Sequence, residues 1–390
     1  MGGSWRSRLR RKLANSSQTP SPPPPHPPRN PSTGITRYTP NTGTASLRAA
    51  IAAKLASENG LTQYAPGDVV VSNGAKQAIW QALLAACNPG DHVLIPAPYW
   101  VSYPEMARLA GAEPVVLPST AEGGFLLTPE VLKAAITPAS RLLILCTPSN
   151  PSGAVYSKPQ LEALAAVIAP HPRLLVLSDE IYEYIVYPPA QHVSFGSLPG
   201  MAGRTLTVNG FSKAYAMTGW RLGYLAAPPP YAAAAAVIQS QSTSGASSIA
   251  QHAGLAALEK LGPHGGAPVA EMVAAFQARR DFVCARLRAL PGVRLPSDPA
   301  GAFYALFDVS ALVGSGAAAK GFGPVPDVDA LCRYFVESAG VALVPGDAFG
   351  APNCVRLSYA AGLETLGAAL DRLEKALGKE VYTPAGAAGK

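Results

Sequence analysis

The sequence predicts an α/β protein with a large domain, built on a mostly parallel sheet covered by helices, and a smaller α+β domain. The first observation is that short apolar runs alternate with helical patterns from Asp68 onward. The second is that these runs are almost continuously apolar, which is typical of strands buried on both faces of a parallel sheet. The third is that strand and helix patterns become mixed past Pro291. A chain of 390 residues is long enough for both domains.

The large domain is expected at 31–290. It begins with a turn-rich loop at 31–45 that leads into a first helix at 45–58. Apolar runs then predict strands at 69–71, 92–95, 114–117, 141–145, 173–178, 205–208 and 222–225. Helices separate these strands, among them an alanine-rich helix that extends through Cys87 and a helix at 101–109. After Tyr231 the pattern turns helical and includes a long helix at 269–290.

The small C-terminal domain is expected at 291–380. Short strands are predicted at 302–307 and 355–358, and helices at 327–338 and 363–377. The last residues, 381–390, are rich in glycine and alanine and are expected to form a flexible tail.

The first 30 residues differ in composition from the rest of the chain. Residues 1–18 hold five basic residues and no acid, and eight prolines follow within the twelve positions 20–31. Such a segment forms neither a helix nor a central strand, so residues 1–30 are expected to be disordered. The basic part has the composition of an organelle transit peptide; a disordered basic tail and a mispredicted first exon are the alternatives.

The formal net charge of +7 comes from residues 1–57, which hold nine basic residues and no acid. After residue 57 the chain carries 22 basic and 24 acidic residues, so a nucleic-acid-binding body is not indicated. No apolar stretch approaches the roughly 20 residues that a membrane span needs, so no membrane partner is expected. The five cysteines are dispersed without metal-ligand spacing, and no metal site is expected.

One stretch suggests the chemistry. Lys213 follows the apolar run at 205–208 and has no carboxylate near it in the sequence, a setting that suits an amine which attacks a carbonyl carbon. Arg221 comes eight residues later and offers a fixed cationic fork for a phosphate. Taken alone, such a pair more often lies on the surface. Together, a reactive amine and a phosphate site are what an enzyme using pyridoxal phosphate (PLP) needs.

The other strand ends strengthen this hypothesis, because ligands of open α/β sheets bind beyond the carboxyl ends of the strands. The small-residue turn at 72–76 opens a helix whose first N–H groups suit a phosphate. Trp100 is suited to stack on a flat ring, or else is a core aromatic. Asn150 places an amide at a rigid turn. Asp179 ends an apolar strand and needs a cation or donor there, such as a protonated pyridine nitrogen.

Four stretches carry a resemblance to a known family: KAYAMTGWRLG at 213–223, DEIY at 179–182, SNPSG at 149–153 and PYWVSY at 98–103. Together they resemble the class I/II aminotransferases of PLP fold type I. The similarity is greatest to the bacterial-type aspartate aminotransferases, and among these to the plastid aspartate/prephenate aminotransferases. It extends over residues 36–377.

The resemblance implies roles in cofactor binding. Lys213 matches the lysine that binds PLP covalently, and Asp179 matches the aspartate at the pyridine nitrogen. The remaining matches to cofactor-binding positions are Asn150 and Tyr182 at the ring hydroxyl, Trp100 on the ring face, Arg221, Gly74 and Ala75 at the phosphate, and Tyr38 at the phosphate of the partner subunit. Lys213, Asp179 and Tyr182 are the expected catalytic residues.

The resemblance also implies how substrate is bound. Arg356 matches the arginine for the substrate α-carboxylate, and Lys76 matches a lysine for the distal carboxylate. Trp100 and Asn150 are expected to border the same substrate. Two departures stand out: Gly210 occupies a position where many relatives have a phosphate-binding serine, and the basic, proline-rich head occupies the place of the family's N-terminal segment.

The implied activity is PLP-dependent transamination between aspartate or glutamate and an oxo acid: oxaloacetate, 2-oxoglutarate or prephenate. The implied assembly is a homodimer. The location would be the plastid if the head is a transit peptide, and the cytoplasm otherwise. Three alternatives remain open at this point: another PLP enzyme such as a lyase or decarboxylase, a PLP-domain transcription regulator, and a truncated, weakly active or inactive relative. The regulator would need a DNA-binding module, for which the head is too short and too rich in proline.

Overall fold

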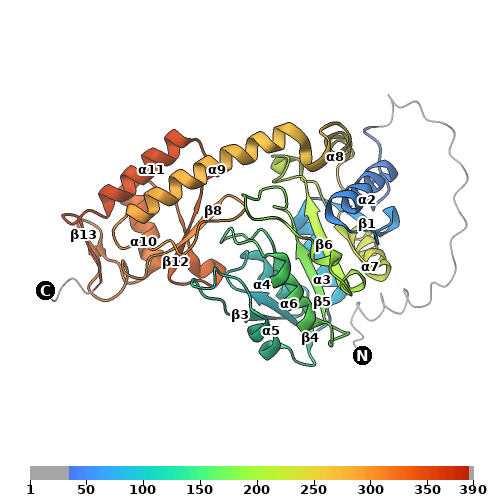
Figure 1. Ribbon diagram of the computed structural model, residues 1–390, viewed down its shortest axis with the longest axis horizontal. Coiled ribbons are helices and arrows are strands. Elements are labelled where there is room, and N and C mark those ends of the chain that lie inside the picture. The colour runs from blue at the N-terminus through green and yellow to red at the C-terminus, as the bar shows by residue number, and fades with distance from the viewer. Residues whose placement is uncertain (1–34, 386–390) are drawn as a thin grey trace, which may run out of the picture. The chain divides into compact units, whose positions relative to one another are not determined.

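The computed structural model describes residues 35–385 (Figure 1). The predicted disordered head at 1–30 and the end of the predicted tail at 386–390 lie outside the described residues. By its contacts the chain divides after Arg37, and the residues from Tyr38 onward form one compact unit.

A seven-stranded sheet is the centre of the large domain. Its strands are β1 (Val69–Ser72), β2 (His92–Pro96), β3 (Glu113–Leu117), β4 (Ser140–Cys146), β5 (Leu175–Asp179), β6 (Thr205–Gly210) and β7 (Gly223–Ala226). They lie in the order β1-β7-β6-β5-β4-β2-β3. β7 is antiparallel to both of its neighbours, and the other pairs are parallel. The prediction of a mostly parallel sheet is therefore confirmed.

The central strands are buried on both faces, which explains their continuous apolar runs. In β4, Leu142 and Ile144 belong to one buried cluster, while Leu143 and Leu145 belong to another. Successive side chains of a strand point to opposite faces, so each face needs its own apolar set. One face carries α3 (Ala75–Ala86), whose Ala78, Ile79 and Ala82 share the first cluster.

The remaining helices of this part are α2 (Ala45–Asn59), α4 (Ser102–Leu109), α5 (Pro129–Ala135), α6 (Lys158–Ile168), α7 (Pro229–Ser240) and α8 (Ser248–Lys260). α2 begins where the Thr44 side chain accepts a hydrogen bond from the Leu47 N–H, and it ends at Gly60 in the left-handed region. Within the described residues, no helix combines the length and the apolar character needed to cross a membrane.

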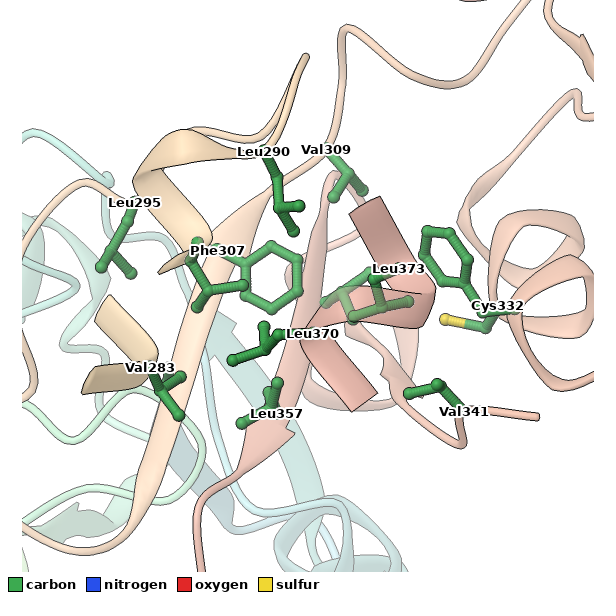
Figure 2. Packing of buried hydrophobic residues seen from close by; sticks show 14 of the residues in the cluster. Val283, Leu290, Leu295, Phe307, Val309, Cys332, Val341, Leu357, Leu370 and Leu373 are labelled. Atoms are coloured by element: carbon green, nitrogen blue, oxygen red, sulfur yellow. The ribbon is translucent and has the colours of Figure 1, made fainter. Parts of the chain in front are cut away.

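The C-terminal part has its own apolar core. α9 (Gly266–Ala289) runs from the α8 end of the large domain to the C-terminal elements (Figure 1). Its second half packs with α10 (Val328–Tyr334), α11 (Leu363–Ala376) and an antiparallel sheet of β11 (Val344–Pro345), β12 (Cys354–Ser358) and β8 (Tyr304–Asp308). Figure 2 shows Val283 of α9 near Phe307, Leu357 and Leu370. This core thus includes residues before 291, and the predicted domain boundary stays a prediction.

The predicted flexible tail is wrong at its start. β13 (Tyr382–Thr383) forms a small sheet with β9 (Ala318–Ala319) and β10 (Gly323–Pro324). Tyr382 is buried, and its hydroxyl donates to the Leu312 carbonyl oxygen at 2.6 Å. The pairing of β13 with β9 and the buried Tyr382 ring hold this segment in place, and the glycine- and alanine-rich composition of the tail gives no sign of either contact.

Candidate active site

A cavity of about 430 Å³ lies at the carboxyl ends of the central strands. Its volume is in the range of small-molecule sites. Nine predicted site residues line it: Ala75, Lys76, Trp100, Asn150, Asp179, Tyr182, Lys213, Arg221 and Arg356. Gly74 lies beside the cavity against Arg221. Tyr38 is fully exposed and does not line the cavity of its own chain.

Lys213 lies in the turn that follows β6, which ends at Gly210. Burial lowers the pKa of its amine, the nearby Arg221 and Arg356 cations lower it further, and Asp179 opposes them. A lowered pKa leaves more of the amine neutral near neutral pH. The Lys213 side chain is therefore suited to act as a nucleophile and as a base.

Asp179 is the last residue of β5 and is buried. Its carboxylate accepts hydrogen bonds from the Tyr103 hydroxyl at 2.7 Å and from the Ile181 N–H at 3.2 Å. Burial raises the pKa of Asp179 to about 6, although the Tyr103 and Ile181 hydrogen bonds lower it. A carboxylate that is costly to ionise without a partner will bind a cationic group presented in the cavity.

Tyr103 was not assigned a role from the sequence. It lies in α4, three residues after Trp100, and it also lines the cavity. The available signal was its place in the PYWVSY stretch at 98–103, which also contains Trp100.

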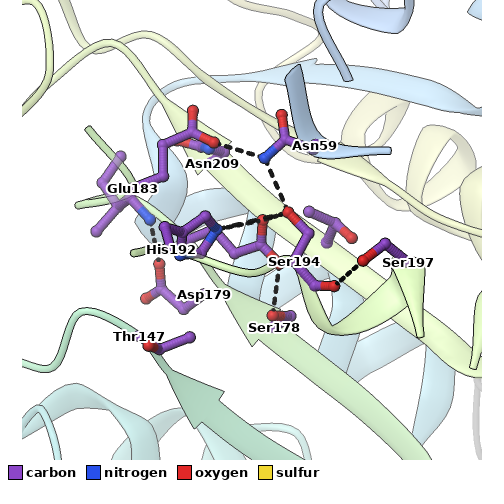
Figure 3. Close-up of polar contacts among 12 residues, drawn as sticks. Asn59, Thr147, Ser178, Asp179, Glu183, His192, Ser194, Ser197 and Asn209 are labelled. Atoms are coloured by element: carbon purple, nitrogen blue, oxygen red, sulfur yellow. Dashed lines mark hydrogen bonds and ion pairs between the residues drawn. The ribbon is translucent and has the colours of Figure 1, made fainter. Parts of the chain in front are cut away.

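A second buried carboxylate, that of Glu180, follows Asp179 in the chain, and Figure 3 labels its partners Ser178, His192 and Ser194 in the same view as Asp179. Glu180 is fully buried and accepts hydrogen bonds from Ser178 at 2.7 Å, from Ser194 at 2.6 Å and from the His192 ring at 3.2 Å. Although burial opposes it, these donors hold the pKa of Glu180 below its ordinary value. Glu180 is therefore ionised, and its charge adds to the raised pKa of Asp179.

Asp179→Asn is expected to stabilise the cofactor-free protein. The ordinary pKa of an aspartate is 3.8 and the folded value is about 6, so the folded state binds the extra proton between these values. The protonated Asp179 carboxyl group therefore contributes fully to the free energy of unfolding below about pH 4, and this contribution is lost as the pH rises through about 6. Denaturant unfolding should show a gain of up to about 3 kcal/mol for Asp179→Asn at pH 7.5 and little change at pH 4. A loss of stability at pH 7.5 would contradict this account.

The opposite corner of the cavity is suited to an anion. α3 begins at Ala75 after Gly74, which has a φ of 85°. Arg221 precedes β7, and its Nη1 donates to the Thr218 carbonyl oxygen at 2.9 Å. A Cβ on Gly74 would lie 2.5 Å from Arg221 Nη2, so the guanidinium lies directly over the start of the helix. The first N–H groups of a helix and a guanidinium together form a phosphate site.

Gly210 has a structural reason for departing from the family pattern. It pairs with Gly223 across β6 and β7. A Cβ at position 210 would lie 2.8 Å from the Gly223 Cα and 2.9 Å from the Leu222 carbonyl oxygen. A serine is therefore excluded here unless the strands move apart.

Arg356 of β12 is held from three sides. Its Nη1 donates to Asn150 Oδ1 at 2.9 Å. The guanidinium carbon lies over the rings of Tyr304 and Phe349, at 4.6 and 4.7 Å from their centroids. Its Nε is buried and has no hydrogen-bond partner among the described residues. An unsatisfied buried donor on a cation is a site for a ligand carboxylate.

Lys76 is the other cation suited to a substrate carboxylate. It lies in the first turn of α3 and is exposed. Its Nζ lies 4.8 Å from the centre of the Trp100 ring. Trp100 packs edge-on against Tyr103, with 5.4 Å between ring centroids. The position of the ammonium group is thus set by an aromatic ring, with no acidic partner within salt-bridge distance in the described part of the chain.

Comparison with known families decides the class of enzyme. Residues 20–373 match the family described as aminotransferase class I and II. The chain belongs to the class I and II aminotransferases. Members of this family depend on PLP, so the chain is a PLP-dependent aminotransferase of fold type I.

Individual relatives agree with the family assignment. The chain is 59% identical over 344 residues to a bifunctional aspartate aminotransferase and glutamate/aspartate-prephenate aminotransferase of Petunia hybrida, covering 88% of this chain and 71% of the relative. It is 58% identical over 358 residues to an aspartate aminotransferase of Pinus pinaster, covering 92% and 71%. The crystal structure of the aspartate aminotransferase of Rhizobium meliloti superposes with a TM-score of 0.84 at 42% identity, covering 90% of this chain and 85% of that one.

The cavity of this aminotransferase fits PLP by the chemistry of its groups. Arg221 and the start of α3 suit the phosphate. The buried Asp179 carboxylate, which is costly to ionise without a cationic partner, suits a protonated ring nitrogen. The Lys213 amine suits covalent attachment of the cofactor. When bound, PLP supplies an electron sink for the pair left on the substrate Cα.

Proposed function

We propose that this aminotransferase transfers the amino group between aspartate or glutamate and an oxo acid, with prephenate among the acceptors. The observation that carries this proposal is that two cations, Arg356 and Lys76, border the same cavity as Lys213 and Asp179. Arg356 offers an unsatisfied buried donor, and Lys76 lies over Trp100. Two cations suit a substrate with a carboxylate at each end. The name of the Petunia hybrida relative supports aspartate, glutamate and prephenate, and that of the Pinus pinaster relative supports aspartate.

Each residue then has a defined task. Arg221 with the Gly74–Ala75 backbone holds the phosphate, Trp100 covers the ring, and Asn150 and Tyr182 hold its hydroxyl. Asp179 keeps a proton on the ring nitrogen. Lys213 Nζ takes the proton from the substrate Cα and later returns a proton to complete the transfer. Arg356 and Lys76 orient the substrate so that its Cα–H bond faces Lys213.

Steady-state assays on the purified chain test the substrate proposal. We expect aspartate and glutamate to donate amino groups to 2-oxoglutarate, oxaloacetate and prephenate. Release of carbon dioxide or elimination products as the main outcome would favour a decarboxylase or lyase. The complete absence of turnover with cofactor bound would favour an inactive relative.

Lys76→Ala is expected to change substrate preference. The lost ion pair should lower kcat/KM for aspartate by about tenfold or more, because the distal carboxylate would lose its cation. Alanine has no distal carboxylate, so its kcat/KM should change little. Equal losses for aspartate and alanine would contradict the role of Lys76.

We propose that the active unit is a homodimer with shared sites, in which Tyr38 serves the partner subunit. Its support is the full exposure of Tyr38 and its place just before α2. Co-expression of Tyr38→Phe and Lys213→Ala chains should partly restore activity, because one site of each heterodimer would carry neither change. If both variants are impaired alone and isolated heterodimers show no recovery, Tyr38 does not act in the partner's site.

We also propose a plastid location. The basic, proline-rich head and the two plant relatives support it. The cytoplasm is the alternative if the head is not a transit peptide.

A further inference from the structure

We propose that Tyr304 positions two residues of the site at once, with its hydroxyl orienting Tyr182 and its ring holding Arg356. This inference rests on the proposed function, because it acts through the roles given there to Tyr182 and Arg356. Tyr304 lies in β8, in the C-terminal part of the chain, and it lines the same cavity. It is therefore a positioning residue that links the cofactor side of the site to the substrate side.

The hydroxyl half of the inference concerns a proton. The hydroxyl groups of Tyr304 and Tyr182 lie 3.0 Å apart, both in buried side chains, and either oxygen could be the donor. A phenol has one proton to donate. If Tyr304 donates to Tyr182, the Tyr182 proton is left free to point into the cavity, where the ring hydroxyl of the cofactor would accept it. Without the Tyr304 hydroxyl, the Tyr182 hydroxyl loses the bond that orients it.

The ring half concerns the direction of a guanidinium. In the antiparallel pair of β8 and β12, Arg356 lies opposite Leu306. Tyr304 is two residues along from Leu306, so its side chain shares a strand face with that of Arg356 and lies within diagonal reach. The ring of Tyr304 covers the guanidinium at 4.6 Å, and the ring of Phe349 lies at 4.7 Å. With both rings packed against it, the guanidinium is held in one orientation before any carboxylate binds, and its Nε is left without a partner among the described residues.

Two substitutions separate the role of the Tyr304 hydroxyl from the role of its ring. Tyr304→Phe keeps the ring and removes the hydroxyl, whereas Tyr304→Leu removes both. Tyr359→Phe is the matched control, because Tyr359 is buried nearby and its hydroxyl contacts Tyr187 and the Ala302 carbonyl oxygen, outside the cavity. The probes are calorimetric binding of maleate, an unreactive dicarboxylate, to each holoenzyme, and a pH titration of the absorbance of the bound cofactor.

We expect Tyr304→Phe to bind maleate within about twofold of the parent but to shift the pH midpoint of the cofactor absorbance and to lower kcat with little change in KM. Tyr304→Leu should show the same spectral shift and also weaken maleate binding by about tenfold. Tyr359→Phe should change neither readout. Equal maleate affinities for the Phe and Leu variants would overturn the ring half. An unshifted midpoint in Tyr304→Phe would overturn the hydroxyl half, and this variant remains decisive if Tyr304→Leu does not fold.

Arg356→Lys, measured in parallel, separates this inference from the proposed function. If Arg356→Lys leaves maleate binding unchanged, Arg356 is not the carboxylate residue and the ring half falls together with that assignment. If Arg356→Lys weakens binding and Tyr304→Leu does not, the substrate assignment stands and the role of the Tyr304 ring is refuted.

Discussion

Lys213→Ala is expected to abolish transamination, lowering kcat by about 10⁴-fold or more. The variant loses the amine whose pKa is lowered by burial and by two arginines. The other lysine of the cavity lining, Lys76, lies over Trp100, whereas Lys213 lies over Tyr182. Two measurements check this expectation: steady-state rates with aspartate, and borohydride reduction of the loaded protein followed by mass spectrometry.

The parent should carry the reduced cofactor on Lys213, and the variant should carry none. Lys158→Ala is a suitable control, because Lys158 is exposed at the start of α6. Attachment at Lys76, which also borders the cavity, would refute the assignment of Lys213.

Asp179→Asn should lower kcat by about 10³-fold, the second largest effect expected. The amide has nearly the shape of the carboxylate but no charge, so it cannot keep a proton on the ring nitrogen. The same substitution is expected to stabilise the cofactor-free protein above about pH 6, because it removes the carboxylate whose pKa burial raises. Activity and stability should therefore move in opposite directions.

If Asp179→Asn lost both activity and stability, disrupted folding would explain the lost turnover. Asp371→Asn offers a control at an exposed aspartate on α11, where neither property should change strongly.

The sequence was sufficient to predict the large sheet, because its strands are apolar on both faces. The alternate packing of Leu142 and Leu143 into separate clusters is the physical cause of that uninterrupted pattern. The rule that parallel strands bring their carboxyl ends to one edge predicted part of the cavity lining, whereas Tyr182 and Arg356 were expected from the family resemblance. Asp179 after β5 and Lys213 after β6 needed only this rule to be placed together.

Other features depend on tertiary contacts that carry no local signal. Tyr304 reaches the cavity from β8, 122 positions after Tyr182, and only the packing of the C-terminal part brings them together. The sequence shows Glu180 next to Asp179 but does not show its three hydrogen-bond donors. Ser178 precedes it in the chain, and His192 and Ser194 follow it by more than ten residues. The composition of residues 381–390 predicts a flexible tail, but the buried Tyr382 ring and the pairing of β13 with β9 hold its first residues.

The close approach of Gly210 and Gly223 has a consequence for how this lineage can evolve. A Cβ at position 210 would lie 2.8 Å from the Gly223 Cα, and a Cβ at position 223 would lie 2.5 Å from the Ala75 N at the start of α3. Neither position can therefore acquire a side chain unless β6, β7 and the start of α3 move apart. A shift in spacing would also move Arg221, two residues before Gly223. Substitutions at positions 210, 221 and 223 should therefore be coupled: a single change should destabilise the fold or the phosphate site, and only combined changes should be tolerated.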